Sequence, residues 1–168
     1  MLRAQEKGFV DIQVISFDVM NTILTLREPP HIVYARFARQ YGFSPDESKM
    51  KAAFPIAFSS FADEFPAFGH KTIGAMEWWG KTEWKIVDEE TIPILERLRL
   101  KGIHTAVISN FDFRLKKLLD DFHLSSLLEL VVLSGEVGIE KPNSRIFELV
   151  TDHFHLKSPK HLLHIGEI

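Results

Sequence analysis

The sequence contains no cysteine among its 168 residues, and this absence removes several classes of chemistry at once. Disulfide bonds, thiolate catalysis and cysteine-ligated zinc sites are all excluded. Long apolar runs are missing too, and no stretch approaches the roughly 20 residues that a membrane-spanning helix needs. The first residues include Arg3, Glu6 and Lys7 and lack the apolar core of a signal peptide. These absences predict a soluble, intracellular protein, with the cytoplasm as its compartment.

The sequence also lacks a large excess of charge of either sign. The chain has 20 Lys and Arg against 23 Asp and Glu, a formal net charge of −3. Such a balance gives no general attraction to nucleic acid or to acidic membranes, so we expect neither as a partner. The length suits one ordinary domain, or a small domain that carries an insertion.

Apolar segments of two periodicities alternate along the chain and indicate an α/β fold. Short, β-branched runs predict four buried strands, at residues 12–17, 103–108, 130–133 and 162–165. Segments with helical spacing follow the same alternation, at residues 89–101, 111–122 and 144–154. Strands that alternate with helices of this length imply right-handed crossovers and a parallel sheet.

The segment between residues 29 and 85 does not fit that alternation. It opens on Pro29 and Pro30 and is rich in Phe, and its spacing predicts helices at residues 31–41, from Ser44 to about Phe61, and from Thr72 to Trp84. We therefore divide the chain into a core, residues 1–28 with 86–168, and an all-helical insertion after the first strand, residues 29–85.

Polar side chains stand at the carboxyl ends of the predicted strands. Asp18 ends the first strand, Ser109 and Asn110 end the second, Lys141 lies in the loop after the third, and Glu167 follows the fourth. Because the carboxyl ends of parallel strands meet at one edge of a sheet, these side chains are expected to converge.

The converging set suits phosphoryl transfer. It offers a carboxylate nucleophile, a hydroxyl and an ammonium group for phosphate oxygens, and two carboxylates for Mg²⁺. Each residue also has an ordinary reading: Asp18 as a turn residue, Ser109 and Asn110 as a helix cap, Lys141 as a solvated loop residue and Glu167 as part of a frayed terminus. Four suitable strand ends in sequence order favour the functional reading.

Four stretches resemble the four motifs of the haloacid dehalogenase superfamily: Phe17–Thr22 (FDVMNT), Val107–Asn110 (VISN), Glu140–Pro142 (EKP) and His164–Glu167 (HIGE). The helical insertion resembles that family's cap, and the resemblance covers nearly the whole chain. It implies a parallel, Rossmann-like sheet with a helical cap inserted after the first strand.

The resemblance also implies a role for each position. Asp18 corresponds to the nucleophile and an Mg²⁺ ligand, and the Met20 backbone carbonyl to a second ligand. Ser109 and Asn110 correspond to phosphate-binding residues, and Lys141 to the residue that neutralises nucleophile and phosphate. Glu167 stands where the family has an acidic metal-site residue.

Three departures from the family's pattern bear on activity. The position that holds the general-acid Asp in the family's phosphatases is Met20, so a contribution of roughly 10²–10⁴-fold is lost. Glu167 replaces the usual Asp, although Mg²⁺ tolerates geometric error poorly. The sequence ends at Ile168, before the family's last strand or strands, and the insertion looks short between Trp79 and Trp84. The resemblance therefore implies a shortened form with weak or lost activity.

Three functions follow from this reading, in order. The first is an Mg²⁺-dependent phosphatase that acts on a small phosphoester through an aspartyl-phosphate at Asp18. The second is a non-catalytic member of the fold, either a binding module or an incomplete isoform. The third is dehalogenation, placed last because Met20, Asn21 and Glu167 depart from what dehalogenases carry at these positions.

Two further expectations concern the last strand, residues 162–165. This strand is predicted to form an open sheet edge that is apolar and free of Lys and Pro, so it invites self-association. The histidines near it, His153, His155, His161 and His164, are interpreted as solvated or capping residues rather than as a zinc site, because i, i+2 spacing does not put two ligands on one helix face.

Overall fold

The computed structural model describes residues 11–64 and 84–166, and the helix predicted from Thr72 lies outside these ranges except for Trp84. In chain order the elements are β1 (Val14–Phe17), β2 (Leu24–Leu26), α1 (Pro30–Gln40), α2 (Glu47–Glu64), β3 (Trp84–Ile86), α4 (Thr91–Leu100), β4 (His104–Ser109), α5 (Arg114–Asp121), β5 (Leu130–Leu133), α6 (Ser134–Val137), α7 (Ser144–His153) and β6 (Leu162–Ile165).

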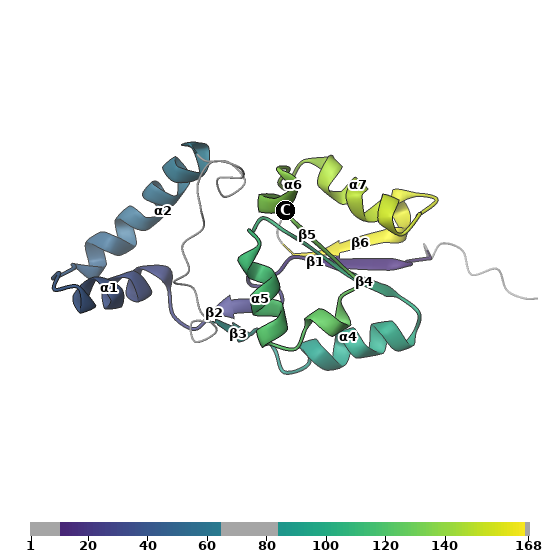
Figure 1. The fold of residues 1–168 in the computed structure, drawn as a ribbon, viewed down its shortest axis with the longest axis horizontal. Helices are drawn as coiled ribbons and strands as arrows, with labels where there is room; N and C mark the ends of the chain where they lie inside the picture. Colours follow the sequence, from purple (N-terminus) through teal and green to yellow (C-terminus); the bar gives the residue numbers. More distant parts are fainter. Residues whose placement is uncertain (1–10, 65–83, 167–168) are drawn as a thin grey trace, which may run out of the picture.

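Four strands form a parallel sheet in the order β5-β4-β1-β6. The register sets Phe17 beside Val107 on one side and beside Ile165 on the other. Helices α6 and α7 lie on one side of this sheet and α4 and α5 on the other (Figure 1). The predicted α/β fold with a parallel sheet is therefore confirmed.

Both faces of the sheet are packed with apolar side chains, which explains the nearly continuous apolar runs of its strands. Ile15 and Phe17 of β1 face the cluster formed with α4 and α5, whereas Val14 faces the cluster formed with α7. Because side chains alternate along a strand, β1 contributes to both clusters and is fixed between them.

A second, small sheet was not predicted. Strands β2 and β3 pair antiparallel, with Leu26 opposite Trp84. The prediction that Trp84 ends an aromatic helix was wrong, because this residue belongs to a strand and its side chain is fully buried against Phe111. The pair joins the two ends of the chain segment that contains α1 and α2.

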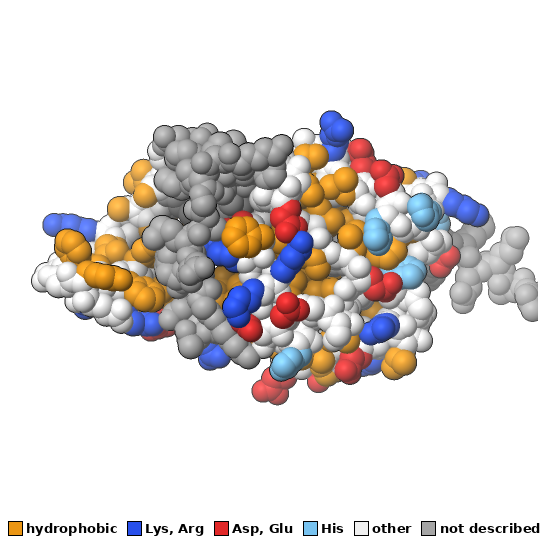
Figure 2. Space-filling view, in the orientation of Figure 1, with side chains coloured by type: hydrophobic (Ala, Val, Ile, Leu, Met, Phe, Trp, Pro, Cys, Tyr) orange, Lys and Arg blue, Asp and Glu red, His pale blue; other side chains and the backbone are white. Residues whose placement is uncertain are grey.

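Helices α1 and α2 pack against each other beyond the end of the sheet where β2 and β3 lie (Figure 1). The rings of Tyr34 and Phe54 meet at a centroid distance of 5.5 Å. Hydrophobic side chains also remain on the outer surface of this pair, where Figure 2 shows them grouped. Tyr41, Phe43 and Ile56 are among the most exposed large apolar residues of the chain.

The starts of two helices differ from their predicted positions for the same reason. An aspartate side chain accepts the first backbone N–H groups of the helix, as short polar side chains do at helix starts. Asp46 accepts from Ser48 and Lys49 at the start of α2. Asp112 accepts from Arg114 at the start of α5, so Ser109 and Asn110 are left for other contacts.

No helix among the described residues is long and apolar enough to cross a membrane.

Candidate active site

Asp18 lies at the carboxyl end of β1, held by a tight turn. Its backbone N–H donates to the Ile165 carbonyl of β6 at 2.8 Å, which extends the parallel pairing by one residue. The next carbonyl, that of Val19, accepts the N–H groups of Thr22, Ile23 and Leu24. The chain therefore turns sharply after the strand, and the carboxylate stays at the sheet edge.

The side chain of Lys141 meets this carboxylate. Its Nζ atom lies 3.1 Å from Oδ1 of Asp18, and only 4% of the Lys141 side chain and 7% of the Asp18 side chain are exposed. An ion pair so well shielded from water is far stronger electrostatically than one on the surface. Sequence reasoning chose both residues, and the structure brings them together although they are far apart in the chain.

Asn110 fixes the loop that carries Lys141. The Nδ2 group of Asn110 donates to the Lys141 carbonyl at 3.0 Å, and the Lys141 N–H donates to Oδ1 of Asn110 at 2.8 Å. The side-chain amide thus holds the loop between α6 and α7, which carries Lys141, against the end of β4. The phosphate contact predicted for Asn110 remains a prediction. If its side chain keeps these two hydrogen bonds, the backbone N–H of Asn110 would be the group that binds phosphate.

Ser109 is the last residue of β4 and is 1% exposed. Because β4 is the direct neighbour of β1, its carboxyl end lies beside that of β1. Ser109 and Asp18 therefore share one edge of the sheet, where sequence reasoning placed them.

Gly166 lies against Asp18, a contact that sequence reasoning did not single out. A Cβ atom built on it would lie 2.4 Å from the Cβ of Asp18 and 2.9 Å from Oγ1 of Thr22. Its φ of +131° is also a conformation that side chains rarely adopt. The backbone of Gly166 therefore packs directly against Asp18, and the signal in the sequence was a glycine just after an apolar strand.

His164 also differs from its prediction. It is not a solvated or capping histidine: Nδ1 of His164 lies 2.9 Å from Oγ of Ser16, and the ring packs edge-on against Phe147. Ser16 is fully buried and is the direct register partner of His164. This contact ties β6 to β1 two residues before Gly166 and Asp18, respectively.

The described residues supply part of a magnesium site. Mg²⁺ prefers oxygen ligands and keeps several waters. Asp18 offers a carboxylate, and Met20 offers a backbone carbonyl to which none of the described residues donates a hydrogen bond. Glu167, the third predicted ligand, lies outside the described residues. Among the described residues no three His, Cys, Asp or Glu side chains form a group that could hold a metal ion. The carboxylate of Asp18 and the carbonyl of Met20 are oxygen ligands of the kind that a hydrated Mg²⁺ accepts.

The side chain of Met20 takes no part in this polar edge. It is partly buried and packs against the apolar cluster on the α4 and α5 face. The position two residues after Asp18 therefore offers no side-chain proton donor, as the sequence indicated.

Comparison with known proteins agrees with the motif-based resemblance. The family model described as haloacid dehalogenase-like hydrolase matches residues 12–167. The human haloacid dehalogenase-like hydrolase domain-containing protein 3 is 27% identical, over 94% of this chain and 75% of its own length. That alignment is 192 residues long, more than the 168 residues of this chain, so the human protein carries internal residues that have no counterpart here.

Solved structures show the same fold. A HAD phosphatase from Thermococcus onnurineus superposes with a TM-score of 0.66 at 19% identity, covering 94% of this chain and 78% of the other. A putative beta-phosphoglucomutase from Thermotoga maritima superposes with a TM-score of 0.70 at 17% identity, covering 91% and 75%. With the family model matched over nearly the whole chain, this protein belongs to the haloacid dehalogenase-like hydrolases.

Proposed function

We propose that this hydrolase is a phosphatase that acts on a small phosphoester, with Asp18 as the nucleophile. The observation that carries the proposal is the buried contact between Asp18 Oδ1 and Lys141 Nζ, at 3.1 Å. A carboxylate in contact with an ammonium group suits nucleophilic attack on a dianionic phosphate, because the lysine offsets the negative charge of both. The solved HAD phosphatase of the same fold agrees with this reaction class.

The reaction has two steps. An Asp18 carboxylate oxygen attacks phosphorus, and the bond from phosphorus to the ester oxygen breaks. The ester oxygen leaves with the bonding electron pair and takes a proton from water to become the alcohol. A water oxygen then attacks the phosphorus of the aspartyl-phosphate, the bond from phosphorus to the Asp18 oxygen breaks, and inorganic phosphate and the free carboxylate are released while the water's proton passes to solvent. The Lys141 ammonium group offsets the charge of the phosphoryl oxygens, and Ser109 and the backbone N–H at Asn110 donate hydrogen bonds to them.

Bound Mg²⁺ would neutralise phosphate charge and orient it for attack. Asp18 and the Met20 carbonyl would hold this ion, with Glu167 as a further ligand. This assignment follows the oxygens available at the sheet edge, and the metal requirement is part of the proposal.

Met20 limits the rate of the first step. Its apolar side chain packs against the core and has no proton to give, so the leaving alcohol must depart as an anion or take a proton from water. Turnover is expected to be weak for alkyl phosphates. This same feature favours the second candidate function, a non-catalytic binding protein built on the hydrolase fold.

We further propose that residues 29–85 form the cap of this enzyme and that residues 1–28 and 86–168 form its core. The described helices α1 and α2 pack on each other, and the paired strands β2 and β3 close the base of the segment. The strands of the main sheet point their carboxyl ends toward this side (Figure 1). The helices are thus placed to cover a small substrate.

Replacement of the nucleophile tests the proposal. We expect Asp18→Asn to abolish Mg²⁺-dependent hydrolysis of a generic aryl phosphate while the far-UV circular dichroism stays unchanged. Asp120→Asn is a matched control, because Asp120 is exposed and remote in sequence from the four motifs; this variant should keep full activity. Equal activity of Asp18→Asn and the unaltered chain would remove Asp18 from the mechanism, and no activity in either would favour the non-catalytic function.

A further inference from the structure

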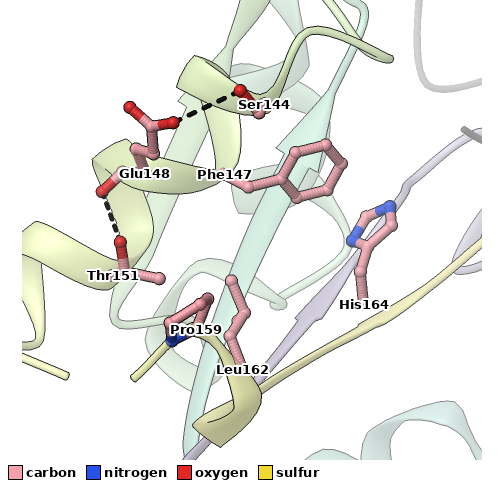
Figure 3. A pocket seen from close by; sticks show the side chains of 7 residues that line it. All are labelled: Ser144, Phe147, Glu148, Thr151, Pro159, Leu162 and His164. Carbon is pink, nitrogen blue, oxygen red and sulfur yellow. Dashed lines mark hydrogen bonds between the residues drawn. The ribbon is translucent and has the colours of Figure 1, made fainter. Parts of the chain in front are cut away.

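Strand β1, which carries Asp18 at its end, is fixed on the side of β6 by contacts within the proposed core. Nδ1 of His164 lies 2.9 Å from Oγ of Ser16. Phe147 of α7 points its ring toward the ring of His164, and both rings line an open hollow between α7 and β6 (Figure 3). These contacts do not involve residues 29–85, so they hold β1 independently of the insertion.

The other side of the site contacts the base of the insertion. Strands β2 and β3 form a two-stranded ribbon that begins in the turn after Asp18. The N–H of Asn21 donates to the Leu24 carbonyl at 2.8 Å, and the N–H of Val87 donates to the Ile23 carbonyl at 3.0 Å. The ribbon therefore joins both ends of the insertion to the core as one unit.

Trp84 anchors this ribbon in the core. It is the first residue of β3 and is fully buried, whereas Lys85 is exposed and Ile86 is only partly buried. Its ring meets the ring of Phe111 edge-on, with a centroid distance of 5.9 Å and an interplanar angle of 69°. Edge-to-face pairs of aromatic rings are favourable beyond the area that they bury. The position of the ribbon and the orientation of Phe111 are therefore set together.

Phe111 directly follows Ser109 and Asn110, the two predicted phosphate-binding residues. Its carbonyl accepts the N–H of Gly135 at 2.9 Å, which ties its backbone to α6. Its ring is 9% exposed and belongs to the same apolar cluster as Trp84. The backbone of Phe111 is thus held by α6, and its ring is held by the base of the insertion.

We propose that Trp84 is a positioning residue of the phosphatase site, which acts through the ring of Phe111 to set the place of the Asn110 backbone N–H. The inference rests on the proposed function, because it takes residues 109–110 as the place where phosphate binds. Close-packed interiors transmit small displacements, so a shift of the ribbon moves Phe111 and the residue before it. Coupling between two places is reciprocal, so phosphate at the site must also change the surroundings of Trp84.

This reciprocal effect can be measured without turnover. The chain contains three tryptophans, so labelling with 5-fluorotryptophan gives three ¹⁹F signals, and the Trp84 signal is the one lost in Trp84→Phe. We expect inorganic phosphate with Mg²⁺ to shift this signal by more than its line width, and sodium chloride at equal ionic strength to leave it in place. Phe111→Leu should remove most of the shift, while calorimetry still shows phosphate binding.

Kinetics with an aryl phosphate give the second measurement. Trp84→Leu keeps an apolar side chain but removes the aromatic contact, and we expect it to lower kcat by about 10²-fold, the effect of a displacement of about 1 Å in the site. Trp84→Phe keeps a ring and should retain most of the activity. Leu124→Ala is the control, because Leu124 is fully buried in the same cluster but precedes β5, toward the amino ends of the strands. It should lower stability and leave kcat near its original value.

The outcomes separate this inference from the proposed function. Phosphate that binds without moving the Trp84 signal, or an equal shift in Phe111→Leu, would overturn the coupling and leave the phosphatase proposal standing. An equal loss of kcat in Leu124→Ala and Trp84→Leu would show that lost stability, not position, lowers the rate. Absence of both phosphate binding and turnover in the unaltered chain would remove the proposed function and the coupling with it. If Trp84→Leu does not fold, the ¹⁹F measurement on the unaltered sequence still decides.

Discussion

Asp18 and Lys141 place two opposite charges where little water reaches them, at the end of an otherwise apolar strand. Removing two such groups from water costs several kcal/mol for each ion, and their attraction seldom returns more than this cost. The pair is therefore expected to contribute little to the net free energy of folding. The contact instead holds the carboxylate and the ammonium group close together at the carboxyl end of β1, which is why it carries the proposed function.

Under the proposed function, Met20 determines which phosphate esters this site hydrolyses. Without a proton donor the rate should depend steeply on how stable the leaving group is as an anion, so aryl phosphates should be hydrolysed much faster than alkyl phosphates. We expect Met20→Asp to raise kcat for an alkyl phosphate by about 10²–10⁴-fold and to change aryl phosphate turnover far less. Steady-state kinetics with the two esters measures the difference.

The control for this substitution is Met20→Leu, which keeps the apolar packing of the side chain and adds no proton donor. Its ratio of aryl to alkyl turnover should match that of the unaltered chain. A gain with Leu equal to that with Asp would show that packing, rather than proton transfer, limits the reaction.

At the scale of single residues, the sequence identified the charged residues of the candidate site but not the neighbouring residues that contact them across the sheet. Asp18 and Lys141 were found because a carboxylate or ammonium group at a strand end has few structural reasons to be there. His164 and Gly166 were not assigned their roles, because the contacts that define them, to Ser16 and to Asp18, are made across two strands about 150 residues apart. Nothing local in the sequence marks such contacts.

Among the elements, the loop between α6 and α7 depends on the side chain of Asn110, the residue that follows β4. Asn110 makes two hydrogen bonds to the backbone of Lys141, and these fix where the ammonium group stands. We expect Asn110→Ala to lower the free energy of unfolding by about 1–3 kcal/mol, because partly buried groups lose their partners. It should also lower kcat by about 10²-fold, since a shift of about 1 Å in a catalytic group has an effect of that size.

Asn143 provides the matched control for that element. It lies two residues after Lys141 and caps α7 through a hydrogen bond from the Arg145 N–H, away from the lysine. Asn143→Ala should cost about 0.5–2 kcal/mol of stability, as cap deletions do, and leave kcat near its original value. Equal losses of kcat in the two variants would show that general loosening, not the position of Lys141, is responsible.

The elements that could be predicted are those whose own residues determine them. The strands at 130–133 and 162–165 were predicted with their observed bounds, because a short apolar run between turn residues is typical of a strand. The pairing of β2 with β3 could not be predicted. Each strand has three residues, and most of the insertion separates them, so neither carries a periodic signal. Trp84 was consequently assigned to the wrong kind of element.

On the scale of the whole molecule, the strands of the main sheet point their carboxyl ends toward the side where α1 and α2 lie (Figure 1). Asp18 leads directly into the turn that precedes β2, and the chain then enters α1 and α2 (Figure 1). Asp18, the proposed nucleophile, therefore lies close in sequence to the junction between the proposed core and the proposed cap.

The central claim is that Asp18 accepts a phosphoryl group. The most direct test is to mix the chain with an aryl phosphate and Mg²⁺, quench with acid within the first turnovers, and measure the intact mass. The account predicts a species heavier by one phosphoryl group, mapped to Asp18 by peptide analysis and absent from Asp18→Asn. Turnover without this species, or the same added mass in the Asp18→Asn chain, would contradict it.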